Sequence, residues 1–188
     1  MMKVLFVCTG NICRSPMGEY LFPLFFNDSG LVMDSAGVQG LPASPIDPSS
    51  ERLLQADGID ASAFRSKRLV PQIARSADLI LCFSTHQRNE IVRQNPTVGR
   101  RTFTLNDFAN ICSYCAQHHL VSGDTLEQRL ASVLEQAPML RNTLPPASDI
   151  ADPFRKDFAA FEQAHAEILQ ALGTIADALD VKGAHASV

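Results

Sequence analysis

The sequence has no long hydrophobic run, no concentration of basic residues and no even set of cysteines. Its longest uninterrupted apolar stretch near the N-terminus, residues 20–26, is far too short to span a bilayer, so we expect no membrane insertion. The 16 lysines and arginines are scattered along a chain of net charge −4 and form no basic stripe of the kind that binds nucleic acids. Nucleic acid is therefore not an expected partner.

The cysteine count and the first residues bear on the cellular compartment. Five cysteines are an odd number, and Met1 to Lys3 lead directly into a strand-like segment without a signal-peptide cleavage site. A disulfide framework is not expected in such a chain, and the simplest location is cytoplasmic. Each cysteine is therefore judged for reactivity, metal binding or plain burial.

The composition is that of one globular domain. Of the 188 residues, 46% are hydrophobic and 19% are charged. A chain of this length can bury roughly 70% of the surface that it exposes when unfolded. Because no internal repeat and no linker divides the sequence, residues 1–188 are predicted to form a single domain.

Strand-like and helix-like segments alternate along the chain. The expected strands are residues 3–8, 31–36, 77–83 and 101–105, and the expected helices are 17–26, 48–57, 85–94, 126–134 and 158–172. Ser15 and Thr85 are expected to cap their helices, and residues 142–148, which contain two prolines, are expected to form a loop. This alternation predicts an α/β fold of three layers, α/β/α, in which helices cover both faces of a parallel sheet.

The loop after the first strand has the features of an anion site. In such folds ligands bind at the carboxyl ends of the strands, where the next helix begins. The segment at that place reads Cys8-Thr9-Gly10-Asn11-Ile12-Cys13-Arg14-Ser15. Its successive backbone N–H groups can form a phosphate-binding nest, which the following helix reinforces with the positive end of its dipole. Gly10 and Asn11 are residue types that tolerate the positive φ that a nest requires.

Three side chains of this loop suit nucleophilic attack on phosphorus. Cys8 would lie at the floor of the nest, where a helix end and nearby cations stabilise a thiolate. Arg14 offers a planar guanidinium for bidentate contact with two phosphate oxygens. Ser15 can donate a hydrogen bond to the thiolate, which is then a nucleophile aimed at phosphorus. We expect no metal and no cofactor, because Arg14 and the backbone neutralise the phosphate.

The leaving oxygen needs a proton donor, and Asp152 is the main candidate. It lies in the proline-rich loop before the last helix, and the proline that follows restricts it to extended conformations. Asp152 would protonate the leaving oxygen and later activate water against the phosphocysteine, while Phe154 would form a wall for the substrate ring. Asp149 is a competing acid, and Asp47 and Asp107 are weaker candidates.

Residues 4–16, VLFVCTGNICRSP, resemble the signature of the low-molecular-weight protein tyrosine phosphatases. The resemblance continues through residues 34–37, 77–81 and 149–154, and so covers most of the chain. It implies a four-stranded parallel sheet in the order 2-1-3-4 and hydrolysis of phosphotyrosine in proteins through a phosphocysteine intermediate. It also implies that Cys8 is the nucleophile, Arg14 the phosphate ligand and Asp152 the general acid. By the same resemblance Asn11 and Ser15 shape the loop, and Ser35 supports Asn11. The resemblance further implies that Leu41 forms a hydrophobic wall opposite Phe154, and that Cys13 can form a reversible disulfide with Cys8.

Three features depart from the family pattern. Phe64 stands where the family often has a histidine that supports the loop asparagine, which would weaken that support and lower activity. After the Asp-Pro pair the family usually has tyrosine and then small residues, whereas here Phe154 precedes two positive charges, Arg155 and Lys156. Residues 109–148 form a longer segment than the compact family members need, and we interpret them as a helical insertion.

The expected insertion contains four zinc-capable side chains, Cys112, Cys115, His118 and His119. On a helix, Cys112, Cys115 and His119 would lie near one face. A complete tetrahedral set is hard to build from one short helix, and no second cysteine pair occurs elsewhere in the chain. We therefore expect no metal there, and the simpler interpretation is half-buried thiols on an amphipathic helix.

Two other functions stay open at this point. Thioredoxin-coupled arsenate reductases share the anion loop but relay oxidation through further cysteines, and although Cys82 is suitably placed, residues 83–96 contain none. A weakly active or non-catalytic phosphate-binding regulatory protein would not need cysteine, arginine and acid together. The sequence therefore predicts a cysteine-dependent protein-tyrosine phosphatase with phosphotyrosine-containing proteins as its substrates.

Overall fold

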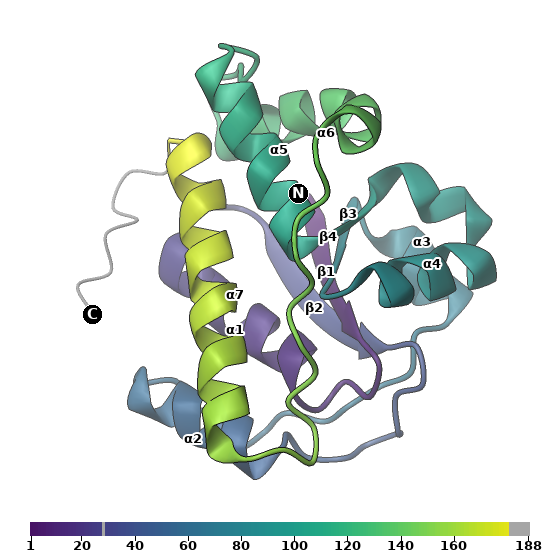
Figure 1. Ribbon diagram of the computed structural model, residues 1–188, viewed down its shortest axis with the longest axis vertical. Helices are drawn as coiled ribbons and strands as arrows, with labels where there is room; N and C mark the ends of the chain where they lie inside the picture. The colour runs from purple at the N-terminus through teal and green to yellow at the C-terminus, as the bar shows by residue number, and fades with distance from the viewer. Residues whose placement is uncertain (28, 181–188) are drawn as a thin grey trace.

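The computed structural model describes residues 1–27 and 29–180 and is built on a four-stranded parallel sheet. Its strands are β1 (Lys3–Cys8), β2 (Val32–Gly37), β3 (Leu79–Cys82) and β4 (Thr102–Thr104), in the order β2-β1-β3-β4 (Figure 1). Strand β1 is central, and its residue Val4 pairs with Met33 on one side and Leu79 on the other. The predicted fold class, the number of strands and their order are confirmed.

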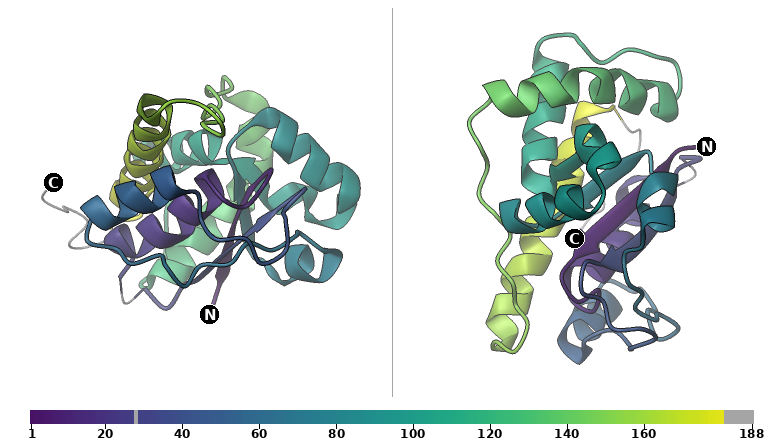
Figure 2. Two further views of the ribbon diagram at one scale, coloured as in Figure 1. Left: turned by 90° about the horizontal axis from the view of Figure 1, so that it is seen from below. Right: turned by 90° about the vertical axis from the view of Figure 1, so that its right-hand side faces the viewer.

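Helices cover both faces of the sheet (Figures 1 and 2). One face of the sheet is covered by α1 (Arg14–Phe25), α5 (Leu105–Gln117) and α7 (Phe158–Ala178). On this side α2 (Pro48–Ala56) packs against α1 and α7, and α6 (Leu126–Thr143) packs against α5. The other face is covered by α3 (Pro71–Ser76), α4 (Thr85–Gln94) and the 3-10 helix η1 (Pro96–Arg101). Side chains alternate along β1, because Val4 and Phe6 belong to the core of the first face and Leu5 and Val7 to that of the second.

Close packing of α1 on β1 sets the geometry of the loop between them. A Cβ atom at Gly18 would lie 2.6 Å from the ring of Phe6, so α1 can approach the sheet this closely only with glycine at that position. The ring of Phe6 also packs against two other rings, and its centroid lies 5.9 Å from that of Phe22 and 6.5 Å from that of Phe83. The strand and the helix that flank residues 9–13 are therefore held by a dense aromatic core.

The predicted helix caps are each displaced. Helix α1 begins at Arg14 rather than after Ser15, with Cys13 at the capping position, because the side chain of Ser15 turns inward toward the loop instead of toward the helix end. Ser84 caps α4 by accepting a hydrogen bond from the backbone N–H of Gln87 at 3.1 Å, so Thr85 is the first helical residue rather than the cap.

Helix α6 continues past its predicted end at residue 134 and includes Pro138. A capping box, formed by Thr125 and Gln128, begins the helix, and a buried stripe of Leu130, Val133, Ala137 and Leu140 faces the core. Because the spacing of this stripe is helical, packing extends the helix through the proline to Thr143, and the loop begins at residue 144 instead of 142. That residues 109–148 form an insertion relative to the family stays a prediction.

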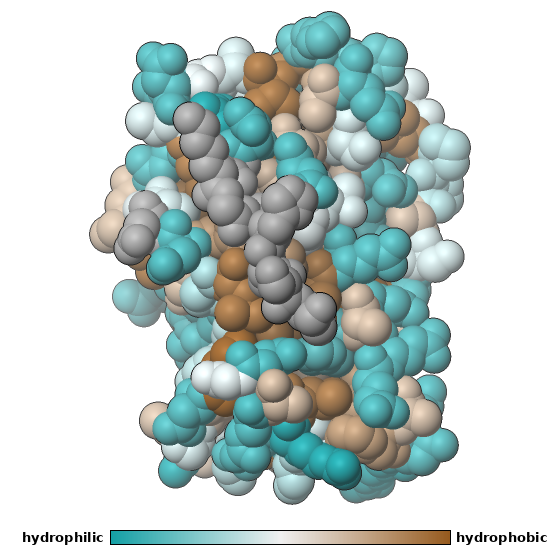
Figure 3. Space-filling view, turned by 90° about the vertical axis from the view of Figure 1, so that its left-hand side faces the viewer, coloured by the Kyte–Doolittle hydropathy of each residue, from teal (hydrophilic) through white to brown (hydrophobic). Residues whose placement is uncertain are grey.

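A shallow apolar groove lies between α1, β2 and the end of α2. Tyr20, Pro23, Leu24, Met33 and Ile59 are among the residues that line this groove. Figure 3 shows apolar side chains gathered among hydrophilic ones on the side of the molecule that carries α1 and α7. None of the helices in the described part of the chain combines the length and the apolar character needed to cross a membrane.

Candidate active site

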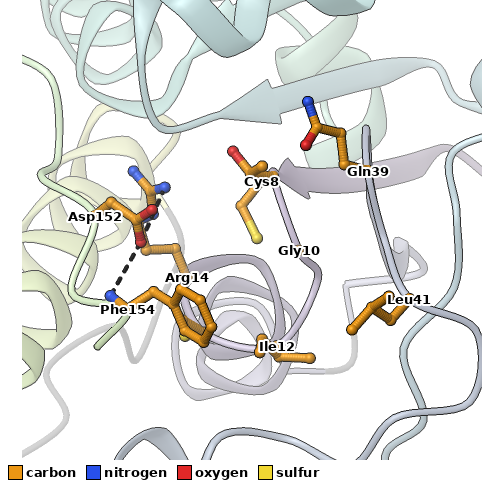
Figure 4. Close-up of a pocket in the computed structure, with 10 residues that line it drawn as sticks. Cys8, Gly10, Ile12, Arg14, Gln39, Leu41, Asp152 and Phe154 are labelled. Atoms are coloured by element: carbon orange, nitrogen blue, oxygen red, sulfur yellow. Dashed lines mark hydrogen bonds and ion pairs between the residues drawn. The ribbon is translucent and has the colours of Figure 1, made fainter. Parts of the chain in front are cut away.

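The Cys8–Ser15 loop curls around the side chain of Cys8. Cys8 ends β1 and is 3% exposed, and its sulfur points into a pocket (Figure 4). The backbone N–H of Asn11 donates to Sγ of Cys8 at 3.3 Å, and Oγ of Ser15 lies 3.0 Å from the same sulfur. Asn11 has a φ of +57°, the left-handed conformation expected for a nest. Two hydrogen-bond donors, one from the backbone and one from a side chain, therefore lie against the sulfur.

The side chain of Asn11 holds the loop in this shape. Its Nδ2 donates to Oγ of Ser15 and to Oγ of Ser35, each at 2.9 Å, and its Oδ1 accepts from the backbone N–H of Lys67 at 2.8 Å. The end of β2 approaches the loop closely, because a Cβ atom at Gly37 would lie 2.8 Å from the Asn11 nitrogen. Ser35 thus contacts Asn11 as the resemblance implies. Both the nitrogen and the oxygen of the Asn11 side-chain amide have hydrogen-bond partners.

Glu19, which the sequence did not single out, completes this network. Oγ of Ser35 donates to Oε2 of Glu19 at 2.5 Å, so Ser35 must accept, not donate, in its contact with Asn11. Asn11 likewise donates its second amide hydrogen to Oγ of Ser15, so the Ser15 hydroxyl keeps its own hydrogen to donate. The sulfur of Cys8, at 3.0 Å, is a closer acceptor for it than the carbonyl of Ala36, at 3.5 Å. Burial raises the pKa of Glu19, and the Ser35 hydroxyl opposes that shift. Its only sequence signal is helical spacing, four residues after Ser15.

The predicted loss of loop support at Phe64 is not seen. Phe64 is buried and packs edge-on against Tyr20, with ring centroids 6.1 Å apart. Oδ1 of Asn11 accepts from the backbone N–H of Lys67, and its Nδ2 donates to Ser35, whose hydroxyl donates to Glu19. Asn11 therefore has a full set of partners without a histidine, and the lower activity expected from Phe64 stays a prediction.

Arg14 lines the pocket, and both of its terminal nitrogens have partners whereas Nε has none. Its side chain is 5% exposed, and Nη1 donates to the backbone carbonyl of Ile150 at 2.8 Å. Nη2 lies 3.4 Å from Oδ1 of Asp152. Nε is buried and has no hydrogen-bond partner among the described residues. A buried donor without a partner is costly, so this nitrogen is available for an anion in the pocket.

The structure separates the two neighbouring acid candidates. Asp152 lines the pocket, and its Oδ1 accepts from the backbone N–H of Phe154 at 3.1 Å, which fixes the carboxylate near Arg14 (Figure 4). Oδ1 of Asp149 instead accepts from the backbone N–H and the hydroxyl of Thr85, at 2.9 and 3.3 Å. Asp149 therefore attaches the loop before α7 to the first residue of α4, and it does not line the pocket.

The weaker acid candidates also have structural partners. Asp47 caps α2 by accepting from the backbone N–H of Ser49 at 2.9 Å, and Asp107 accepts from the backbone N–H of Ala147 at 2.8 Å. Neither of these aspartates lines the pocket. Asp152 is thus the one sequence candidate of the four that lines it.

The pocket has a polar floor and apolar walls. It has a volume of about 200 Å³ and is lined by Cys8, Thr9, Gly10, Ile12, Cys13, Arg14, Gln39, Leu41, Asp152 and Phe154. Phe154 and Leu41 lie on opposite sides of the pocket, with Ile12 between them (Figure 4). Ser15 and Ser35 act from behind the loop and do not line the cavity. The predicted hydrophobic walls are thus present around a narrow anion site.

The other four cysteines are buried, and their burial disfavours the thiolate. Burial raises the pKa of the Cys13 thiol, with a further contribution from Asp47, and raises that of Cys82 to about 12. Burial also raises the pKa of Cys112 and Cys115. All five cysteines are free thiols, so the reversible disulfide between Cys8 and Cys13 stays a prediction.

We expect iodoacetate to modify Cys8 selectively in the native protein near neutral pH. The thiolate is the reactive form, and raised pKa values keep the other thiols protonated until the pH rises well above neutral. Peptide mass spectrometry after brief alkylation, with and without inorganic phosphate, measures this. Phosphate should protect Cys8, and labelling of Cys13 at an equal rate would contradict the expectation.

The zinc-capable cluster does not assemble. Cys112 and Cys115 are completely buried inside α5, more deeply than the half-burial expected, whereas His118 and His119 lie beyond the helix end and are exposed. His119 leaves the helical path with a φ of +56°, so it does not share a face with the cysteines. Within residues 1–27 and 29–180, no three histidine, cysteine or acidic side chains are grouped to hold a metal ion.

Comparison with known proteins gives a consistent assignment. A family model described as low molecular weight phosphotyrosine protein phosphatase matches residues 3–121. The probable low molecular weight protein-tyrosine-phosphatase EpsP of Ralstonia nicotianae is 32% identical over 161 residues, which cover 86% of this chain and 84% of that protein. The protein-arginine-phosphatase of Bacillus subtilis is 38% identical over 112 residues, covering 57% of this chain and 72% of that protein.

Solved structures show the same likeness. The YwlE arginine phosphatase from Geobacillus stearothermophilus has a TM-score of 0.71 and 27% identity, covering 96% of this chain and 94% of that one. The family model spans more than half of the chain, and Cys8 begins the loop that this family model includes. The chain therefore belongs to the low molecular weight phosphotyrosine protein phosphatase family and is a cysteine-dependent phosphatase.

Proposed function

We propose that this phosphatase hydrolyses phosphotyrosine in proteins, with Cys8 as nucleophile, Arg14 as phosphate ligand and Asp152 as general acid and base. One observation carries the proposal: the sulfur of Cys8 faces a pocket in which Arg14 and Asp152 meet at 3.4 Å. Backbone N–H groups of residues 9–15 would hold the phosphate oxygens, with Nε of Arg14 as a further donor.

In the first step the thiolate of Cys8 attacks phosphorus in line with the phenolic oxygen. The S–P bond forms as the P–O bond breaks, and Asp152 transfers its proton to the departing oxygen. Arg14 stabilises the equatorial oxygens of the transition state, because its guanidinium is already fixed by the carbonyl of Ile150.

The second step hydrolyses the phosphocysteine. Asp152, now a carboxylate, accepts a proton from water as the water oxygen attacks phosphorus. The S–P bond breaks and the electron pair returns to the sulfur of Cys8. The hydroxyl of Ser15, 3.0 Å from that sulfur, donates to it and lowers the cost of its departure as a thiolate.

The pocket walls favour an aryl phosphate over a phosphorylated guanidinium. Ile12, Leu41 and Phe154 can enclose a planar aromatic ring, and burial of such a ring contributes favourable free energy. A phosphoarginine side chain carries N–H groups that need acceptors, and among the pocket-lining residues Asp152 supplies the single carboxylate. Because some relatives are arginine phosphatases, phosphoarginine is the alternative substrate to test.

We expect phosphotyrosine peptides to be hydrolysed at least about ten times faster, in kcat/KM, than phosphoarginine peptides of matched sequence. A pocket that leaves a substrate's polar groups unpaired discriminates by this order or more. Phosphate release should be measured with chelator and reductant present. A preference for phosphoarginine would overturn the tyrosine assignment and leave the phosphatase assignment intact.

A reducing cytoplasm suits the proposed chemistry. The nucleophilic thiol must stay unoxidised, and glutathione and thioredoxin keep thiols reduced in that compartment. We therefore infer that cytoplasmic phosphoproteins are the substrates.

A further inference from the structure

Three exposed basic side chains in and beside the acid loop, residues 152–156, have no acidic partner. Arg155 and Lys156 follow Phe154 in the acid loop, and Arg52 lies on α2; all three are exposed. Within residues 1–27 and 29–180, no carboxylate lies within the 4.0 Å of an ion pair from any of them. We call Arg52, Arg155 and Lys156 the cationic rim.

Aromatic rings hold two of these cations beside the acid loop. The guanidinium of Arg155 lies over the ring of Phe154, 5.1 Å from its centroid, and that of Arg52 lies over Phe158 at 4.3 Å. Phe158 begins α7 directly after the acid loop. Helix α2 is tied to the Cys8–Ser15 loop, because the backbone N–H of its cap donates to the carbonyl of Ile12 at 2.9 Å.

The backbone at Arg155 supports a role for its side chain. Arg155 has a φ of +60°, in a turn that the N–H of Lys156 closes on the carbonyl of Pro153 at 2.9 Å. Glycine or asparagine adopts this left-handed conformation more easily than arginine does. Strained conformations of this kind cluster at ligand-binding sites.

The acidic groups near the mouth are engaged elsewhere. Asp157 caps α7 through the backbone N–H of Ala160 at 3.2 Å, Asp47 caps α2, and Asp152 lies against Arg14. With Asp152 paired to Arg14, the three cations of the rim outnumber the two carboxylates of Asp47 and Asp157, so the net charge of these groups is positive. A bound substrate would meet that field just outside the walls that hold its phosphotyrosine ring.

We propose that the cationic rim selects phosphotyrosines flanked by acidic residues, an inference that rests on the proposed phosphotyrosine activity. An extended peptide advances about 3.3 Å per residue, so glutamate or aspartate within about three positions of the phosphotyrosine reaches the rim. Arg155 and Arg52 would pair with these carboxylates while remaining stacked on their rings. The rim also repels substrates whose flanking residues are basic.

The test compares three phosphotyrosine peptides that differ only in having acidic, neutral or basic flanking residues. At low ionic strength we expect kcat/KM to be about five- to twentyfold higher for the acidic peptide than for the neutral one. This ratio should fall toward one near 0.5 M salt, where charges on exposed groups are screened beyond about 4–5 Å. The double variant Arg155→Gln/Lys156→Gln should reduce the ratio to about two, and Arg52→Gln should reduce it further.

Arg93→Gln is the matched control, because it removes one exposed arginine from the last turn of α4, at the far end of that helix from the pocket. The ratio for this variant should equal that of the parent protein. An equal loss in Arg93→Gln, or equal rates for all three peptides with the parent, would overturn the rim as a selective surface. Failure of the parent to hydrolyse any of the peptides would instead overturn the proposed phosphotyrosine activity.

Discussion

Replacement of Cys8 by serine is expected to abolish turnover, with a loss in kcat on the order of 10⁴-fold or more. A serine hydroxyl is almost wholly protonated at neutral pH, so the two donors beside position 8, the N–H of Asn11 and the hydroxyl of Ser15, cannot turn it into an equivalent nucleophile. The measurement is phosphate release from an aryl phosphate, followed under reducing conditions with parent and variant side by side.

Binding of inorganic phosphate provides the control for Cys8→Ser. The nest and Arg14 remain in the variant, so calorimetry should give a dissociation constant within a few-fold of the parent's. Turnover by Cys8→Ser at more than about one-hundredth of the parent rate would show that another group attacks phosphorus, and the covalent mechanism would then be wrong.

The change Asp152→Asn is expected to lower kcat for phosphotyrosine by about 10²- to 10⁴-fold. Asparagine keeps an oxygen for the backbone N–H of Phe154, so the loop retains its shape while the transferable proton is lost. An activated aryl phosphate, whose phenol departs without protonation, should lose less of its rate in the bond-breaking step. Single-turnover kinetics with both leaving groups separates that step from hydrolysis of the intermediate.

Asp149→Asn is the matched variant for this prediction. Its side-chain oxygen can still accept from Thr85, and the structure places this residue outside the pocket, so we expect less than about a fivefold change in kcat. A large and leaving-group-dependent loss in Asp149→Asn, with little effect of Asp152→Asn, would reverse the acid assignment.

The Cys8–Ser15 loop could be predicted from the sequence because its chemistry is local. Cys8, Arg14 and Ser15 lie within eight consecutive residues between a strand and a helix, and backbone connectivity alone brings them to one anion. The sheet could be predicted for a similar reason, since alternating strands and helices permit few connections besides a parallel, helix-covered sheet. Asp152 could be predicted as the general acid from the Asp-Pro pair, although the sequence left Asp149 as an alternative for that role.

The helix boundaries show where local signals fail. Ser15 has the residue type of a helix cap, but its hydroxyl forms stronger interactions inside the loop with Cys8 and Asn11. Pro138 has the residue type of a helix breaker, but burial of a whole face of α6 outweighs one lost hydrogen bond. In both cases tertiary contacts outweigh a local preference, for capping a helix at Ser15 and for ending one at Pro138, that is worth about 1–3 kcal/mol.

The sequence by itself predicted the nucleophile, the anion loop and the fold class, and its resemblance to a known family implied the order of the strands. The tertiary structure alone decided which acid lines the pocket, that Glu19 and Lys67 complete the network around Asn11, and that Arg52 lies near the acid loop. These contacts join segments far apart in the chain, and their geometry depends on how α1, α2 and α7 pack. No spacing within the sequence encodes such distances, because packing fixes them only once the whole core has formed.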